Sequence, residues 1–157
     1  MEIWKADQEV VDMAEELIKN HHPDLVIVMD EIAFVFREKA SKRGEHVVLG
    51  TSKKAAPVIK ALSGIDYKFI IELAADEWQS LSSRQKQALL DHHLCACRVE
   101  EDAEDGSVKC TIAPPDVSFY WDELDRWGDW RPHPDRGNGP PPDVKGVFMQ
   151  GNEIPEA

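Results

Sequence analysis

The sequence has no long hydrophobic run and only three cysteines. Its apolar runs, such as Leu25–Met29 and Phe69–Ile71, fall far short of the roughly 20 residues that a membrane-spanning helix needs. The first residues contain no basic segment followed by an apolar stretch, so we expect no signal peptide. Two of the cysteines stand in Cys95-Ala96-Cys97, too close for an ordinary disulfide. These absences predict a cytoplasmic protein without a membrane partner.

Basic residues are also scarce. The chain has 18 Lys and Arg against 30 Asp and Glu, a formal net charge of −12. Because contacts to phosphate need Lys and Arg, this balance argues against direct binding of nucleic acid. Its 157 residues suffice for one domain with its own core.

The acidic excess is concentrated in residues 100–130, which contain ten acids and only two bases. One interpretation is a solvated face that keeps the protein soluble. The other is a patch that binds a protein with a basic surface. The candidate residues of such a patch are Glu100, Glu101, Asp102, Glu104, Asp105, Asp122, Glu123 and Asp125.

Periodicity predicts the elements of the first half. Apolar residues at helical spacing indicate a helix over residues 7–20, ended by His22-Pro23. The β-branched run 25–29 favours a buried strand. Residues 32–37 alternate and predict a strand whose hairpin partner is 45–49, while 67–73 alternate again. Residues 51–64 receive no assignment.

The second half begins with a well-marked helix. Ser82 and Gln85 fit a capping box, and the helix continues to Cys97 with an almost wholly apolar surface. Residues 98–112 read as a ribbon around Asp105-Gly106, followed by a last helix over 117–127 with Asp116 as its N-cap. Residues 131–157, with six of the ten prolines, predict an extended arm. The fold class is therefore α+β, with one domain over 1–130 and the arm after it.

The central helix carries the chemistry of interest. A catalytic zinc takes two helical ligands from His-Glu-x-x-His, whose histidines share one face and whose Glu is the general base. The corresponding window here is His92-His93-Leu94-Cys95-Ala96. The first His is present, whereas the base and the second ligand are replaced.

Several segments, taken in order, resemble the putative phage metallopeptidase family, a compact zincin-like domain of bacteriophages and prophages. Its members typically read Asp-His-Glu-Leu-x-His across the helix and His-Asp-Val at the start of the last helix. The likeness covers about residues 5–131. The matching segments are Ile71–Leu73, Trp78, Leu81–Ser82, Gln85–His92, Leu94–Cys95, Asp116–Val117 and Asp125–Trp130.

The resemblance implies where the family's active-site residues fall. The first zinc ligand falls on His92 and the general base on His93. The second and third ligands fall on Ala96 and Pro115. A single imidazole cannot hold zinc in a catalytic geometry, so we expect no catalytic residue and no cofactor.

Other donor atoms leave zinc as an alternative. Cys95, Cys97 and Cys110 could join His92, but Cys95 and Cys97 point about 200° apart on a helix. A buried cysteine is more often a small hydrophobe, which is the interpretation we prefer for all three.

The function expected from these patterns is that of a pseudoenzyme. A phage-type metallopeptidase-like protein without its catalytic site would act as an acidic protein-binding module in the host cytoplasm. Its partner would be a host or phage protein with a basic surface, such as a nucleic-acid-binding defence factor that it inhibits. The alternatives are a zinc-dependent hydrolase with relocated ligands and a virion or assembly component. The oligomeric state is left open.

Overall fold

The computed structural model of the chain describes residues 1–115 and 121–127. It divides into two units, Met1–Pro114 and the residues from Pro115 onward, which are described separately. In the second unit, α5 (Trp121–Trp127) confirms the end of the predicted last helix. The predicted N-cap Asp116, the domain end at residue 130 and the arm 131–157 lie outside the described residues.

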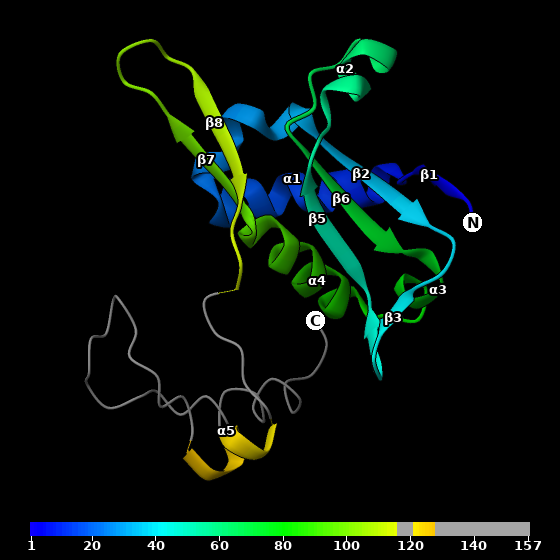
Figure 1. Cartoon of the computed structure of the whole chain (residues 1–157). Helices are drawn as coiled ribbons and strands as arrows, with labels where there is room; N and C mark the ends of the chain where they lie inside the picture. The colour runs from blue at the N-terminus through cyan, green and yellow to red at the C-terminus, as the bar shows by residue number, and fades with distance from the viewer. Residues whose placement is uncertain (116–120, 128–157) are drawn as a thin grey trace. The chain divides into compact units, whose positions relative to one another are not determined.

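A four-stranded mixed sheet forms the centre of the first unit (Figure 1). The strands are β1 (Ile3–Lys5), β2 (Ile32–Arg37), β6 (Phe69–Ala74) and β5 (Gly50–Lys54), in that spatial order. The pair β2–β6 is parallel, and the pairs β1–β2 and β5–β6 are antiparallel. This confirms the strands predicted over 32–37 and 67–73 and the α+β class.

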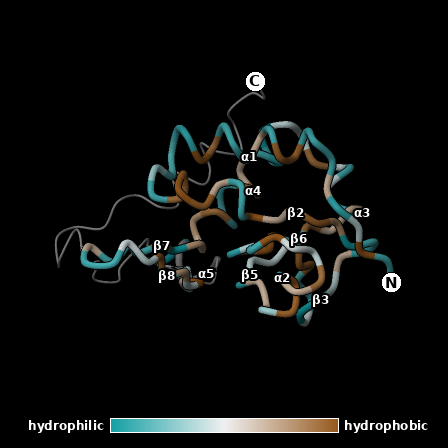
Figure 2. Tube along the Cα trace, turned by 90° about the horizontal axis from the view of Figure 1, so that it is seen from above, coloured by the Kyte–Doolittle hydropathy of each residue, from teal (hydrophilic) through white to brown (hydrophobic). Residues whose placement is uncertain are grey.

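Two long helices, α1 (Gln8–His21) and α4 (Ser83–Cys95), lie on one face of this sheet (Figures 1 and 2). Every second residue of β2 and β6 points toward them and is buried, as strand alternation requires. Both predicted helices are confirmed, although α4 ends two residues before Cys97. The core consists mainly of Val10, Ala14, Ile18, Phe34, Phe36, Phe69, Ile71, Leu73, Leu90 and Leu94.

The predicted strand over 25–29 is wrong. These residues belong to the 3₁₀ helix η1 (Pro23–Glu31). Leu25 and Val28, three residues apart, are buried, whereas Val26 and Ile27 are 47% and 52% exposed. Pro23 at the first helical turn favours this start, because its fixed φ suits a helix and its missing N–H is not needed there. The run therefore forms a 3₁₀ helix that buries every third residue, despite its β propensity.

The predicted hairpin is wrong in its partner. Both edges of β2 are occupied, by β1 and β6, so residues 45–49 cannot pair with it. Instead β4 (His46–Val48) pairs with β3 (Ser41–Arg43) around Gly44, whose φ of +66° is in the left-handed region. The unassigned residues 51–64 form most of β5 and α2 (Pro57–Ser63), with Pro57 in its first turn.

The predicted ribbon is confirmed as β7 (Cys97–Glu101) and β8 (Val108–Ile112). Its turn contains Gly106 at φ +70°. A short helix, α3 (Ala75–Trp78), follows β6 and was not predicted. Among the described residues, no helix is long and apolar enough to cross a membrane.

Candidate functional site

The helix α4 positions the residues of the metallopeptidase window. Its start is fixed by the predicted capping box: the Ser82 side chain accepts from the Gln85 N–H, and the Gln85 side chain accepts from the Ser82 N–H. Leu90 and Leu94, one turn apart, are completely buried and fix the rotation of the helix about its axis. The side chains of residues 91–93, which lie between these two leucines, therefore project from the helix in different directions.

The four family positions have very different surroundings. His92 is exposed, and its ring centroid lies 5.1 Å from that of the buried His93. Ala96 is half-buried and Pro115 is exposed, and neither has a side-chain donor atom for a metal. The residues at the positions that the resemblance assigns to the ligands therefore do not supply three donor side chains for a catalytic zinc.

The imidazole of His93 is wedged against β5. A Cβ atom added to Gly50 would lie only 2.8 Å from His93 Nε2, so the ring occupies space that glycine alone leaves open. On the other side of the ring, Ser52 Oγ lies 3.0 Å from Nδ1 and donates to the His93 carbonyl oxygen at 3.0 Å. A hydroxyl has one proton, so when it donates to the carbonyl it must accept from Nδ1. This network selects the tautomer with the proton on Nδ1.

Burial also determines the charge of His93. Desolvation, helped by the nearby His92, lowers the pKa of His93 from 6.5 to about 4. At neutral pH the ring is therefore uncharged, and only 8% of the residue is exposed. In the His-Glu-x-x-His motif the general base is a carboxylate, and a buried neutral imidazole differs from it in both charge and exposure.

The three cysteines do not share one environment. Cys97 and Cys110 are buried on one face of the ribbon, as expected for small hydrophobes. Burial raises the pKa of Cys97 to about 12 and raises that of Cys110, so both thiols are protonated at neutral pH. Cys95 is exposed, so the expectation that it is buried is wrong. It is the last residue of α4, and α4 turns it away from the core.

Cys95 lies beside two residues that the sequence analysis did not select, His22 and Asp91. The ligand atoms of these three side chains all lie within 4.8 Å of one another, and His22 Nε2 is 2.7 Å from Asp91 Oδ1. His22 was expected only to end the first helix; it does cap α1, but its side chain is only 13% exposed. The i, i+4 spacing of Asp91 and Cys95 could have indicated from the sequence that these two side chains are neighbours. Nothing in the sequence indicated the contact of Asp91 with His22, which is 69 residues away.

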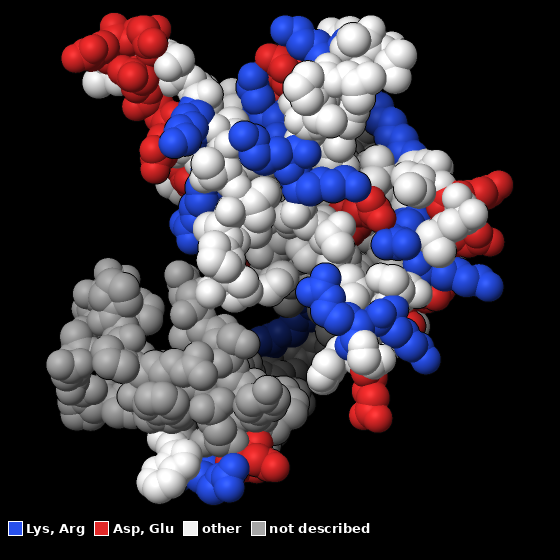
Figure 3. Space-filling model, viewed as in Figure 1, with Lys and Arg blue, Asp and Glu red and all other residues white. Residues whose placement is uncertain are grey.

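The predicted partner-binding acids fall on two elements. Glu100, Glu101, Asp102, Glu104 and Asp105 are exposed on the ribbon, and Figure 3 shows acidic side chains gathered at its tip. On α5, Asp122 and Asp125 are exposed, whereas the side chain of Glu123 lies outside the described residues. Because α5 belongs to the second unit, the ribbon acids alone define a patch, which we call the ribbon-tip patch.

The backbone of the ribbon turn is held by its own acids. Asp102 Oδ1 accepts from the Glu104 N–H, and Asp105 Oδ1 accepts from the Ser107 N–H, each at 2.8 Å. The bonds to Ser107 lower the pKa of Asp105. Because Asp102 and Asp105 hold the turn, the exposed carboxylates of Glu101 and Glu104 are the better candidates for contact with a partner.

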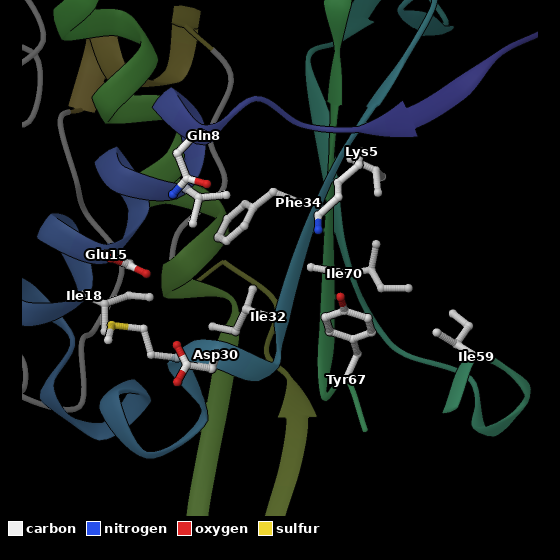
Figure 4. A pocket seen from close by; sticks show the side chains of 14 residues that line it. Lys5, Gln8, Glu15, Ile18, Asp30, Ile32, Phe34, Ile59, Tyr67 and Ile70 are labelled. Carbon is white, nitrogen blue, oxygen red and sulfur yellow. The ribbon is translucent and has the colours of Figure 1, made fainter. Parts of the chain in front are cut away.

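A groove of about 390 Å³ lies elsewhere and is lined mainly by residues of α1, η1 and β2 (Figure 4). Glu15 and Asp30 stand on one side of Ile32 and Phe34, and Lys5 and Tyr67 on the other (Figure 4). Its lining contains none of the family's active-site positions. This groove is therefore separate from the α4 site.

Comparison with known proteins places the chain in a family. The model of the family described as putative phage metallopeptidase matches residues 2–136. Neither curated proteins nor solved structures give a match. The match spans most of the chain and includes α4 with its His92-His93 window. The chain therefore belongs to the putative phage metallopeptidase family.

Proposed function

We propose that this protein is a pseudoenzyme of its family and works by binding a protein through the ribbon-tip patch. The observation that carries the proposal is the display of five exposed carboxylates on one ribbon. The base of the ribbon is anchored, since β7 contacts η1 and β8 contacts β5. A supported ribbon with a charged tip can enter a groove without ordering a flexible loop, which lowers the entropic cost of binding.

The chemistry at α4 supports the other half of the proposal. Hydrolysis by the family's route needs three metal ligands and a base beside the first. In this chain those positions offer one imidazole, two side chains without donors, and a buried neutral His93. A scaffold without that chemistry remains available for binding.

The chemical class of the partner follows from charge. Carboxylates gathered at a protruding tip are complementary to a groove lined with Lys and Arg, and such grooves are typical of proteins that bind nucleic acid. Lys and Arg are spread over the body on the same face (Figure 3), so the negative charge is local to the tip. We therefore propose a host nucleic-acid-binding defence factor as the partner, and inhibition as the outcome.

The test compares two double variants with the same change in charge. Glu101→Lys/Glu104→Lys alters the ribbon tip without touching the carboxylates that hold its turn, and Glu9→Lys/Glu16→Lys alters exposed residues of α1. Tagged full-length protein is incubated with host lysate at low and high salt. The proposal expects a captured protein that the ribbon variant loses, that the α1 variant keeps, and that added DNA or RNA displaces.

Two results would overturn the binding proposal: equal capture by both variants, or capture that neither salt nor nucleic acid changes. The pseudoenzyme half is tested with a peptidase assay in the presence of zinc. Hydrolysis by the wild-type chain that disappears in His92→Ala would refute it. No hydrolysis by the wild type, together with activity after His93→Glu/Ala96→His/Pro115→His, would support it directly.

A further inference from the structure

We propose that His22, Asp91 and Cys95 form a binding site for one divalent transition-metal ion, with zinc as the ion that fits best. The site lies where the end of α1 meets α4 and uses none of the family's ligand positions. It does not depend on the proposed binding function. The observation behind it is the convergence of a nitrogen, an oxygen and a sulfur ligand atom within 4.8 Å.

The backbone holds His22 at this place. His22 is the C-cap of α1, and its N–H donates to the Ile18 carbonyl at 2.9 Å. Pro23 follows and restricts the conformations of the residue before it. Ile18 is itself buried in the core. The imidazole therefore projects from a backbone that is fixed on both sides.

The other two ligands come from one face of α4. Asp91 and Cys95 are four residues apart, which places their side chains on neighbouring turns. This is the spacing by which a helix supplies two metal ligands, here one residue earlier than the family's positions, His92 and Ala96. Leu90 and Leu94 are completely buried beside them and hold this face toward α1.

The distances suit zinc after a small adjustment. With ordinary zinc bond lengths, ligand atoms in a tetrahedral site are about 3.4 to 3.6 Å apart. The atoms of this group are within 4.8 Å of one another, so a small shift of the Cys95 side chain brings Sγ to this spacing. The 2.7 Å contact between His22 and Asp91 is shorter than a zinc site allows. The site reaches zinc geometry if the distance from His22 to Asp91 increases by about 0.7 Å, or if Asp91 binds the ion through its second oxygen.

The donor set favours zinc over harder ions. Thiolate and imidazole ligands select zinc and similar transition metals, whereas magnesium and calcium prefer oxygen alone. Three protein ligands leave a fourth position for water. Bound zinc would tie the end of α1 to the end of α4, adding stability through linkage, because the unfolded chain lacks the assembled site.

The competing explanation is that His22 and Asp91 form a hydrogen-bonded pair without metal. This explanation predicts that Cys95 takes no part in binding a metal ion. The test therefore uses Cys95→Ser and Asp91→Asn, with His46→Ala as the control for an exposed histidine on β4. His92→Ala separates this site from the family's ligand position. Full-length protein is stripped with a chelator, zinc or cobalt is added, and metal content, cobalt absorption and Tm are measured.

The proposal expects one zinc per chain, a higher Tm with zinc, and a sulfur-to-cobalt absorption band with cobalt. Cys95→Ser should abolish the band, and each ligand variant should weaken zinc binding by more than about 100-fold, beyond the range for an outer-shell partner. His46→Ala and His92→Ala should retain stoichiometric zinc. Absence of zinc binding by the wild type would overturn the site. Zinc that survives Cys95→Ser, or that depends on His92 but not on Asp91, would overturn it as well.

Discussion

Acidification should destabilise this protein through His93 in addition to any general effect of its carboxylates. In the folded protein the ring is neutral down to a pKa of about 4, because it is buried against Gly50 and Ser52. In the unfolded chain it takes up a proton near its ordinary pKa of 6.5. Between these values the unfolded state binds more protons, so the free energy of unfolding falls as the pH falls.

The size of the effect follows from the two pKa values. For a single group whose pKa is 6.5 in the unfolded chain and about 4 in the folded protein, the free energy of unfolding is lower than at pH 7 by about 2 kcal/mol at pH 5 and by about 3 kcal/mol at pH 4. That is a large part of the 5 to 15 kcal/mol typical of a domain. The loss belongs to one residue, so a variant can isolate it.

The assay is urea unfolding at a series of pH values for wild type and His93→Asn. The Asn amide can occupy the place of Nδ1 and donate to Ser52, but it does not titrate. The variant starts less stable because it leaves a cavity, so the comparison uses the change with pH and not the value at pH 7. His46→Asn, at an exposed position, should behave like wild type.

Parallel loss of stability in wild type and His93→Asn would refute the reasoning. It would mean that His93 already carries a proton in the folded state or that the ring is accessible to water. Following the imidazole resonances by NMR separates these cases. A resonance that titrates near 6.5 in the folded wild-type protein and is missing from His93→Asn would contradict the buried neutral ring directly.

Three further substitutions test the packing of the same region, each by urea unfolding at pH 7. Gly50→Ala should lower the free energy of unfolding by about 1 to 3 kcal/mol, since its Cβ would meet His93 and the Glu72 carbonyl at 2.8 Å; an unchanged value would contradict this close packing. Glu72→Gln should cost about 1 to 3 kcal/mol because Arg37 and Lys53 both pair with that buried carboxylate, and a neutral effect would refute the pairing. Ser82→Ala should cost about 1 kcal/mol by removing the cap, and full stability would show that the capping box is dispensable.

Features determined by neighbouring residues were predictable from the sequence. The capping box at Ser82 and the turn at Asp105-Gly106 depend on hydrogen bonds and dihedral angles within a few residues, and the structure has both. The alternation of residues 32–37 also survived, because a sheet buries every second side chain.

Features that depend on distant partners were not predictable. The pairing of β4 with β3 followed from the occupation of both β2 edges, which no local pattern reveals. The run 25–29 had strand propensity but became η1, since propensity yields to packing. In the site, the window around His92 was found from its spacing. The contacts of His22 with Asp91 and of His93 with Ser52 join residues 69 and 41 positions apart.

The geometry of α4 separates the side chains that fill the core from those that face other elements. Leu90 and Leu94 fill the core and are under the strongest packing constraint, because a cavity there would cost about 2 to 5 kcal/mol. His93 packs against β5, while Asp91 and Cys95 face the end of α1. Neither proposal needs the other's residues, since the partner surface lies on the β7–β8 tip and the metal site on α4 and α1. Ribbon variants should therefore keep their zinc, and Cys95→Ser should keep its partner; loss of both properties in either variant would mean that the two sites are coupled.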